Sequence, residues 1–288
     1  MQAEDLPAQR YVQNGDAKLF CRSLGKGSPV IVIHGGPGLT QDYLLPQMYQ
    51  LAEDHFVIFY DQRGCGESTA PIDEQSINVA TFISDLEAIR KAYNVGRIAV
   101  IGHSWGGFLA IQYAIKHPEA ISKLILSNSM SATSEDLALF LKEWIKRMGP
   151  FKKEIDDIKA SPEFKEGNSD TVEKYYRIMY RTYCFNPEDA DLLNLRMSPK
   201  AFINGQKVYG FFREQIFTKE FNFIDSLKKL SMPVLIIHGD FDPIPVSSTE
   251  RVHHAIEGSK LVLMKDCGHF PYVENPKLYF KEIDAFLK

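Results

Sequence analysis

The chain has 288 residues, of which 44% are hydrophobic and 24% are charged, and its formal net charge is -4. This balance is ordinary for a soluble globular protein, and it disfavours nucleic acid and anionic membranes as partners. The apolar runs are far shorter than the roughly 18 residues that a transmembrane helix needs, so we expect no membrane span.

Metal and disulfide chemistry are also disfavoured. The adjacent pair His253 and His254 has no cysteine or carboxylate at metal-ligand spacing, so we expect no metal and no other cofactor. Residues 1–16 are polar and acidic and lack the basic and apolar segments of a signal peptide. Four cysteines without CxxC spacing are expected to be reduced and buried, which predicts a cytoplasmic protein: Cys21, Cys65, Cys184 and Cys267.

The predicted elements begin with an antiparallel hairpin over 10–22 that turns at Asn14 and Gly15. Runs of Val, Ile and Leu without polar alternation follow, a pattern typical of strands buried on both faces of a parallel sheet. These runs cover 30–33, 56–60, 98–101, 123–126, 234–237 and 261–264. Helical patterns lie between them at 78–93, 105–116 and 276–287, of which Asn78 can cap the first. The alternation predicts a doubly wound, mostly parallel α/β sheet.

This pattern breaks between 131 and 222, where only helical signals occur. Thr133 with Asp136, Asp170 with Glu173, and Ser198 with Pro199 mark three helix starts: about 133–148, from 170, and from 198. The segment holds 15 of the 34 aromatic residues in about a third of the chain, which favours a lid over an apolar pocket, although some of these rings are expected to fill the lid's own core. We therefore predict a core domain (1–130 and 223–288) and a helical cap (131–222) inserted after the sixth strand.

Gly102-His103-Ser104-Trp105-Gly106 matches the pattern G-x-S-x-G and stands between a predicted strand and a predicted helix. In this setting the serine lies on a strained turn that exposes its hydroxyl, and the flanking glycines avoid a clash of Cβ atoms. The sequence therefore predicts Ser104 as a nucleophile; the alternative is a glycine-rich turn whose serine only caps the helix.

A second glycine-rich loop, 34–38, follows the strand that ends at Ile33. This is the place where such a fold supplies an oxyanion-hole donor, beside the amide of the residue after the nucleophile. We expect the N–H groups of Gly36 and Trp105 to form the oxyanion hole; the alternative for the loop is a tight turn without a catalytic role.

The partners of the nucleophile are predicted from strand ends further along the chain. Asp242 follows the strand 233–238, and His269 follows the last strand. The chain order serine, acid, histidine is the one that this arrangement uses, with the acid orienting the general base. Asp240 is the competing acid, but it lies nearer the strand end, where it is expected to cap the turn. His34 and His103 are expected to have structural roles.

Residues 60–68 are predicted to form a turn after the fourth strand. Asp61 and Arg63 are candidates for substrate contact, but an internal ion pair and hydrogen bonds that tie this loop to the nucleophile's neighbourhood are favoured.

Taken together, HGGPG at 34–38, DQRGCGES at 61–68, GHSWGG at 102–107, GDFDP at 239–243 and CGHF at 267–270 resemble the proline iminopeptidase (prolyl aminopeptidase) branch of the α/β-hydrolases. The resemblance covers nearly all of the chain except the cap. It implies an eight-stranded α/β-hydrolase sheet with an inserted helical cap, and release of an N-terminal proline or another residue from short peptides.

In that family, glutamates that come mostly from the cap bind the free α-amino group of the substrate. The resemblance implies Glu214 for this role, because it lies 28 residues before Asp242, and Gly35 is a second candidate for substrate binding. Some members carry a further glutamate directly after the triad aspartate, where this chain has Pro243. The alternative for Glu214 is a surface position beside a neighbouring cation.

Three functions follow from these patterns and the resemblance. The first, which is favoured, is a proline iminopeptidase-like serine aminopeptidase that releases an N-terminal proline or a small residue from short peptides. The second is a carboxylesterase or amidase for small acyl substrates. The third is a ligand-binding protein on a hydrolase scaffold. All three imply a small-molecule or short-peptide partner, and no pattern predicts an oligomeric state.

Overall fold

The computed structural model describes residues 6–288, and its centre is a sheet of eight strands. The strands are β1 (Ala8–Asn14), β2 (Ala17–Leu24), β3 (Ser28–Ile33), β4 (His55–Tyr60), β5 (Ile98–His103), β6 (Ile121–Ser127), β7 (Val234–Gly239) and β8 (Lys260–Met264). Their order is β1-β2-β4-β3-β5-β6-β7-β8; β1, β2 and β4 pair antiparallel, and all other neighbours are parallel. The predicted fold class is confirmed.

Helices and short 3-10 or π turns join the strands. They are η2 (Gln41–Leu44), η3 (Gln47–Glu53), α1 (Val79–Ala92), α2 (Trp105–Lys116), η4 (Pro118–Ala120), α3 (Ser134–Met148), η5 (Gly149–Phe151), α4 (Lys152–Ala160), α5 (Pro162–Lys165), α6 (Ser169–Arg181), η6 (Pro187–Leu192), α7 (Pro199–Phe212), η7 (Arg213–Phe217), α8 (Ile224–Leu227), α9 (Val246–Ala255), α10 (Pro271–Glu274) and α11 (Pro276–Leu287). None of the described helices is long and apolar enough to cross a membrane.

The sheet is covered on both faces, which explains the continuous apolar runs in its central strands. Ile31 and Val100 face a cluster that includes residues of α1, α2 and α9, whereas Val32 and Ile101 face a cluster that includes residues of η3, α10 and α11. This two-sided burial is the arrangement expected for parallel strands. The last strand differs from its prediction, because β8 lies at the edge of the sheet and Leu263 is 44% exposed.

The N-terminal hairpin is present, but its turn lies one residue later than predicted. Asn14 pairs with Ala17, so the two-residue loop is Gly15 and Asp16. Gly15 has φ of +58°, a left-handed conformation that glycine adopts without a steric penalty. The prediction that residues 1–16 contain no signal peptide falls partly on residues 1–5, which lie outside the described residues.

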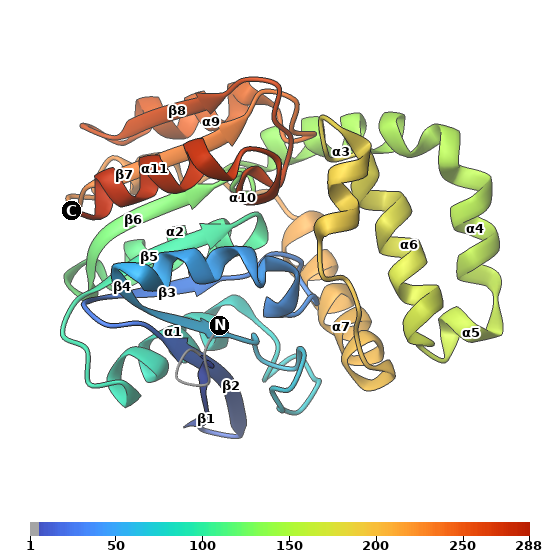
Figure 1. Ribbon diagram of the computed structural model, residues 1–288, viewed down its shortest axis with the longest axis horizontal. Coiled ribbons are helices and arrows are strands. Elements are labelled where there is room, and N and C mark those ends of the chain that lie inside the picture. Colours follow the sequence, from blue (N-terminus) through green and yellow to red (C-terminus); the bar gives the residue numbers. More distant parts are fainter. Residues whose placement is uncertain (1–5) are drawn as a thin grey trace.

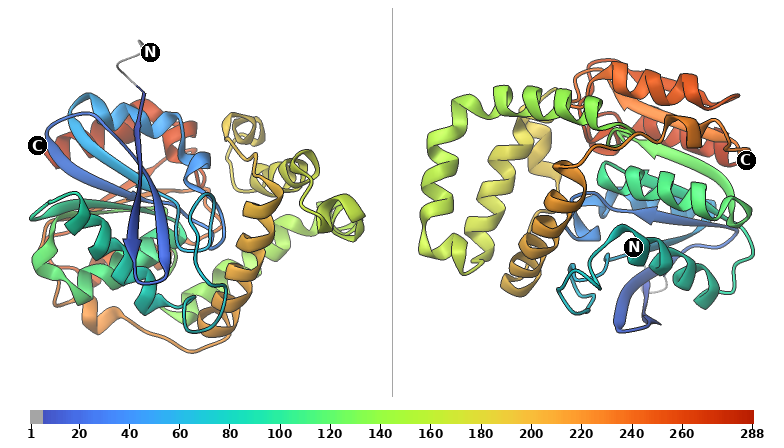
Figure 2. Two further views of the ribbon diagram at one scale, coloured as in Figure 1. Left: turned by 90° about the horizontal axis from the view of Figure 1, so that it is seen from below. Right: turned by 180° about the vertical axis from the view of Figure 1, so that it is seen from behind.

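The inserted segment is helical and lies at the end of the sheet where the parallel strands terminate, as Figure 1 shows for α3 to α7. Thr133 and Ser198 cap α3 and α7 as predicted, whereas α6 is capped by Asn168 and not by a motif at Asp170. The sequence patterns missed the short helices α4 and α5. Figure 2 shows from two further sides that the cap stands beside the core as a separate layer of helices.

The two chain segments that connect cap and core run side by side. Ser134 donates its N–H to the carbonyl of Phe221 at 2.9 Å, and Phe223 donates to the carbonyl of Ala132 at 3.0 Å. An isolated antiparallel bridge between Thr133 and Asn222 joins them. We propose this bridge as the boundary between the core (1–130 and 223–288) and the cap (131–222).

Candidate active site

Ser104 stands at the turn between β5 and α2 in a strained conformation. Its φ of 57° and ψ of -122° are unusual for a residue with a side chain. A Cβ atom on Gly102 would lie 2.4 Å from the carbonyl oxygen of Gly106, and one on Gly106 would lie 2.2 Å from that of Ile33. Positions 102 and 106 must therefore be glycine, because a Cβ atom would clash there, as the sequence suggested.

His269 and Asp242 are brought together from separate loops. Nδ1 of His269 lies 2.7 Å from Oδ2 of Asp242, and both side chains are almost completely buried. A carboxylate can only accept, so Nδ1 carries the hydrogen and Nε2 is left free to accept a proton. Asp240, the competing acid, is exposed and accepts the N–H of Cys267 at 3.4 Å. The geometry supports Asp242 as the partner of the histidine.

Further hydrogen bonds hold the carboxylate of Asp242. Its Oδ1 accepts the N–H of Ile244 at 2.7 Å, and its Oδ2 also accepts the side-chain amide of Asn128 at 2.5 Å. Burial raises the pKa of Asp242, but the charge and hydrogen bond of His269 and the Asn128 amide outweigh it, so that the pKa lies below its usual range. The group is thus an anion that can stabilise an imidazolium.

Ser104 and the imidazole of His269 meet at one cavity, which both line. The described residues show no hydrogen bond between the serine hydroxyl and the ring. Such bonds are commonly long before substrate binds and tighten in the complex. The three residues predicted from sequence thus converge on a common site.

In the glycine-rich loop, the backbone amides of Gly35 and Gly36 differ in their hydrogen bonding. The N–H of Gly35 donates to Oη of Tyr43 at 2.6 Å, and its carbonyl accepts from Nδ1 of His34 at 2.8 Å. Gly35 therefore lines the cavity with both its N–H and its carbonyl already in hydrogen bonds. Gly36 and Trp105 also line the cavity, and no hydrogen bond from either backbone N–H occurs among the described residues. We propose these two amides as the oxyanion donors.

The cavity has a volume of about 260 Å³ and a mainly aromatic wall. Nine of the 15 cap aromatics line it: Phe140, Trp144, Phe164, Tyr175, Tyr176, Tyr180, Tyr183, Tyr209 and Phe217. No Asp, Glu or Arg is among the described lining residues, and Lys159, which is exposed, is their one lysine. Glu214 is exposed on η7 and does not line the cavity. The described part of the wall therefore has no carboxylate for a substrate amine.

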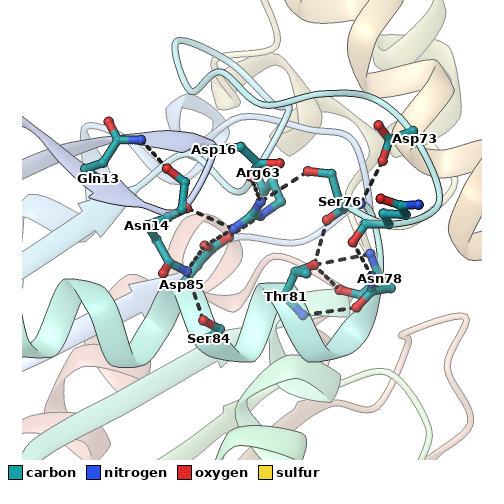
Figure 3. A network of polar contacts seen from close by, with 12 residues as sticks. Gln13, Asn14, Asp16, Arg63, Asp73, Ser76, Asn78, Thr81, Ser84 and Asp85 are labelled. Atoms are coloured by element: carbon teal, nitrogen blue, oxygen red, sulfur yellow. Dashed lines mark hydrogen bonds and ion pairs between the residues drawn. The ribbon is translucent and has the colours of Figure 1, made fainter.

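Asp61 and Arg63, in the loop that follows β4, do not line the cavity. Arg63 forms a bidentate pair with the buried carboxylate of Asp85, at 3.0 and 2.7 Å, and it contacts Asp16 at 2.7 Å (Figure 3). Asp61 accepts the N–H groups of Gln41 and Glu67, both at 2.9 Å. The internal ion pair that the sequence favoured is present and binds the loop to the hairpin and α1. The predicted link to the nucleophile's neighbourhood is made by Gln62, whose Oε1 accepts the indole N–H of Trp105 at 3.1 Å.

Asn128 is a site residue that sequence reasoning missed. It follows β6 with φ of 46°, and its amide also donates to the carbonyl of Gly268 at 3.0 Å. The available signal was a polar residue at the carboxyl end of a predicted parallel strand, the edge at which the other site residues lie. Among the described residues, no group of three metal-ligating side chains occurs, and the four cysteines are unpaired and buried.

Comparison with known proteins bears on this arrangement. The alpha/beta hydrolase fold family model matches residues 28–276. A proline iminopeptidase of Heyndrickxia coagulans is 30% identical over 283 residues, covering 91% of each chain. The structure of proline iminopeptidase from Mycobacterium smegmatis superposes with a TM-score of 0.70 at 23% identity and covers 97% of each chain. An esterase from Exiguobacterium antarcticum superposes with the same TM-score at 20% identity and covers 97% of this chain and 99% of its own.

At these identities, the two superpositions establish the fold and do not distinguish a peptidase from an esterase. The family model spans most of the chain, including the serine turn and both of its partners. The chain belongs to the α/β-hydrolase family.

Proposed function

We propose that this chain is a serine hydrolase that cleaves ester or amide bonds through an acyl-enzyme. Ser104 is the nucleophile, His269 the general base, and Asp242 the acid that orients the histidine. The observation that carries the proposal is that the strained serine and an Asp242-bound imidazole line one cavity. No cofactor is required for this chemistry.

The mechanism follows from the direction of the hydrogen bonds. Nε2 of His269 takes the proton from Ser104 as its oxygen attacks a carbonyl carbon, and Asp242 stabilises the resulting imidazolium. The amides of Gly36 and Trp105 bind the oxyanion, each contributing on the order of 3 kcal/mol. The leaving group departs with the proton from His269, and water then repeats the sequence on the acyl-enzyme.

The lining of the cavity favours uncharged acyl substrates, as in a carboxylesterase or amidase. An ammonium group that enters an apolar cavity needs a paired carboxylate to offset the loss of its hydration. The described wall offers none. Small esters and amides with apolar or aromatic groups do not meet this cost.

An aminopeptidase similar to proline iminopeptidases is the second candidate. It is favoured by the relative from Heyndrickxia coagulans, with 30% identity over 91% of both chains. In this case the amine must be bound by a carboxylate that approaches the cavity on substrate binding, and Glu214 remains the residue proposed for it.

A matched substrate panel separates the two candidates. The panel comprises p-nitrophenyl acetate and butyrate, the p-nitroanilides of proline and alanine, and the N-acetylated forms of these anilides. We expect ester hydrolysis and no preference for a free amine, and Ser104→Ala should abolish turnover. Activity retained by Ser104→Ala would refute the serine mechanism, and binding without turnover by the wild-type chain would support a ligand-binding protein.

Glu214 provides a direct test of the second candidate. If Glu214 binds the substrate amine, Glu214→Ala should raise KM for the free anilides and leave the esters unchanged. We expect no such difference, because the side chain is exposed and outside the cavity. Cleavage of the free proline anilide in strong preference to its N-acetylated form would favour the aminopeptidase.

A further inference from the structure

A line of buried hydrogen bonds connects the glycine-rich loop to the loop of His269. The N–H of Gly35 donates to Oη of Tyr43 at 2.6 Å, and that oxygen lies 2.6 Å from Nδ1 of His103. On the other side of the ring, Nε2 of His103 lies 2.8 Å from the backbone carbonyl of His269. Tyr43 is 3% and His103 is 1% exposed, so water cannot readily replace these bonds.

The chemistry of the end groups fixes which atom donates in each of these hydrogen bonds. The carbonyl of His269 can only accept, so Nε2 of His103 carries the hydrogen and Nδ1 accepts from Tyr43. The oxygen of Tyr43 is then free to accept the N–H of Gly35. Burial, followed by the charge of His269, lowers the pKa of His103 to about 3, while burial raises the pKa of Tyr43. Both groups therefore keep these protonation states at neutral pH.

A second set of bonds ties the glycine-rich loop and Trp105 to Gln62, in the loop after β4. Nε2 of His34 accepts the N–H of Gln62 at 3.1 Å, and the side-chain amide of Gln62 donates to the carbonyl of His34 at 2.6 Å. The indole N–H of Trp105 donates to Oε1 of Gln62 at 3.1 Å. The His34–Gly35 peptide is thus held at its carbonyl by Gln62 and at its N–H by Tyr43, and the carbonyl of the following Gly35–Gly36 peptide accepts from Nδ1 of His34.

We infer that Tyr43 and His103 are positioning residues for the proposed hydrolysis. By occupying the Gly35 amide, Tyr43 leaves the Gly36 amide as the donor that faces the oxyanion. By binding the carbonyl of His269, His103 holds the backbone of the general base at a fixed place relative to Ser104. This inference rests on the proposed serine-hydrolase function. Both side chains line the cavity, and apart from the bond between them their hydrogen bonds run to backbone groups of the two loops.

Tyr43→Phe tests the inference, because it removes only the hydroxyl. We expect kcat for p-nitrophenyl acetate to fall by about 10- to 100-fold, the loss typical of a misplaced catalytic group, with KM within about twofold. The rate at which a fluorophosphonate labels Ser104 should fall in parallel, and this probe needs no knowledge of the natural substrate. Tyr113→Phe is the matched control, since Tyr113 is also buried and its hydroxyl donates to Glu87 at 2.8 Å, away from the cavity.

The outcomes separate the inference from the function on which it rests. Labelling and hydrolysis that are abolished by Ser104→Ala but unchanged by Tyr43→Phe would overturn the positioning role alone, as would equal losses in Tyr43→Phe and Tyr113→Phe. Activity that survives Ser104→Ala would overturn the function itself.

If Tyr43→Phe does not fold, His103 provides the same comparison. His103→Gln keeps an N–H donor near the position of Nε2, whereas His103→Ala keeps none. Faster labelling by the glutamine variant than by the alanine variant supports the inference, and equal rates overturn it.

Discussion

The cap and the oxyanion loop meet through a contact between two backbones, which makes Gly205→Ala a sharp test of the site. A Cβ atom on Gly205, in α7, would lie 2.0 Å from the carbonyl oxygen of Gly38. Real Cβ atoms essentially never approach within 3.0 Å, so α7 and the loop must separate by at least about 1 Å (3.0 minus 2.0). Gly38 is only two residues from Gly36, the proposed oxyanion donor.

A displacement of 1 Å in a catalytic group costs up to about 100-fold in rate. We therefore expect Gly205→Ala to lower kcat/KM for p-nitrophenyl acetate by about 10- to 100-fold. Helix propensity alone would favour alanine by about 1 kcal/mol, so a loss of activity cannot be ascribed to a weaker helix. The assay is steady-state hydrolysis together with urea unfolding of the same preparations.

Gly210→Ala is the matched control on the same helix. A Cβ atom at Gly210 meets nothing within 4 Å. This variant should keep full activity and gain up to about 1 kcal/mol in free energy of unfolding. Full activity in Gly205→Ala, or equal behaviour of the two variants, would refute the argument that α7 sets the position of the oxyanion loop.

Three further outcomes are expected. Arg63→Ala leaves the charge of Asp85 buried without its partner and should lower the free energy of unfolding in urea by about 3–5 kcal/mol; a loss below 1 kcal/mol would contradict this. Asn128→Ala removes one hydrogen bond to the Asp242 carboxylate, about 1.5 kcal/mol, and should reduce kcat roughly tenfold at unchanged KM; an unchanged kcat would mean that the bond is not needed. Burial raises the pKa of Asp61 from 3.8 to about 6, so the native state holds its proton more tightly than the unfolded chain. The stability that this proton contributes, up to about 3 kcal/mol, is complete below about pH 4 and is lost as pH rises through about 6. The change in free energy of unfolding caused by Asp61→Asn should therefore be more favourable at pH 7 than at pH 4.5. An equal change at both pH values would refute this prediction.

Local patterns were sufficient to predict much of the fold. Strands buried on both faces must be continuously apolar, so β3 to β7 were visible in the sequence. Thr133 and Ser198 marked the starts of α3 and α7, because a side-chain oxygen must satisfy the free N–H groups of a helix. Predictions were weaker elsewhere: α6 is capped by Asn168, and α4 follows the 3-10 turn η5 without a side-chain cap. Helix α5 was missed although Ser161 caps it and Pro162 stands in its first turn.

The sequence alone determined which residue types stand at the ends of parallel strands, and hence Ser104, Asp242 and His269 as candidates. It did so because a nucleophile turn imposes strict local demands, which are visible as glycines at fixed spacing. Tertiary structure alone decided which groups line the cavity and which bonds connect distant loops. Glu214 lies outside the cavity, and Tyr43 and His103 join two loops, because these relations depend on how α7 and the loops pack and not on any local pattern.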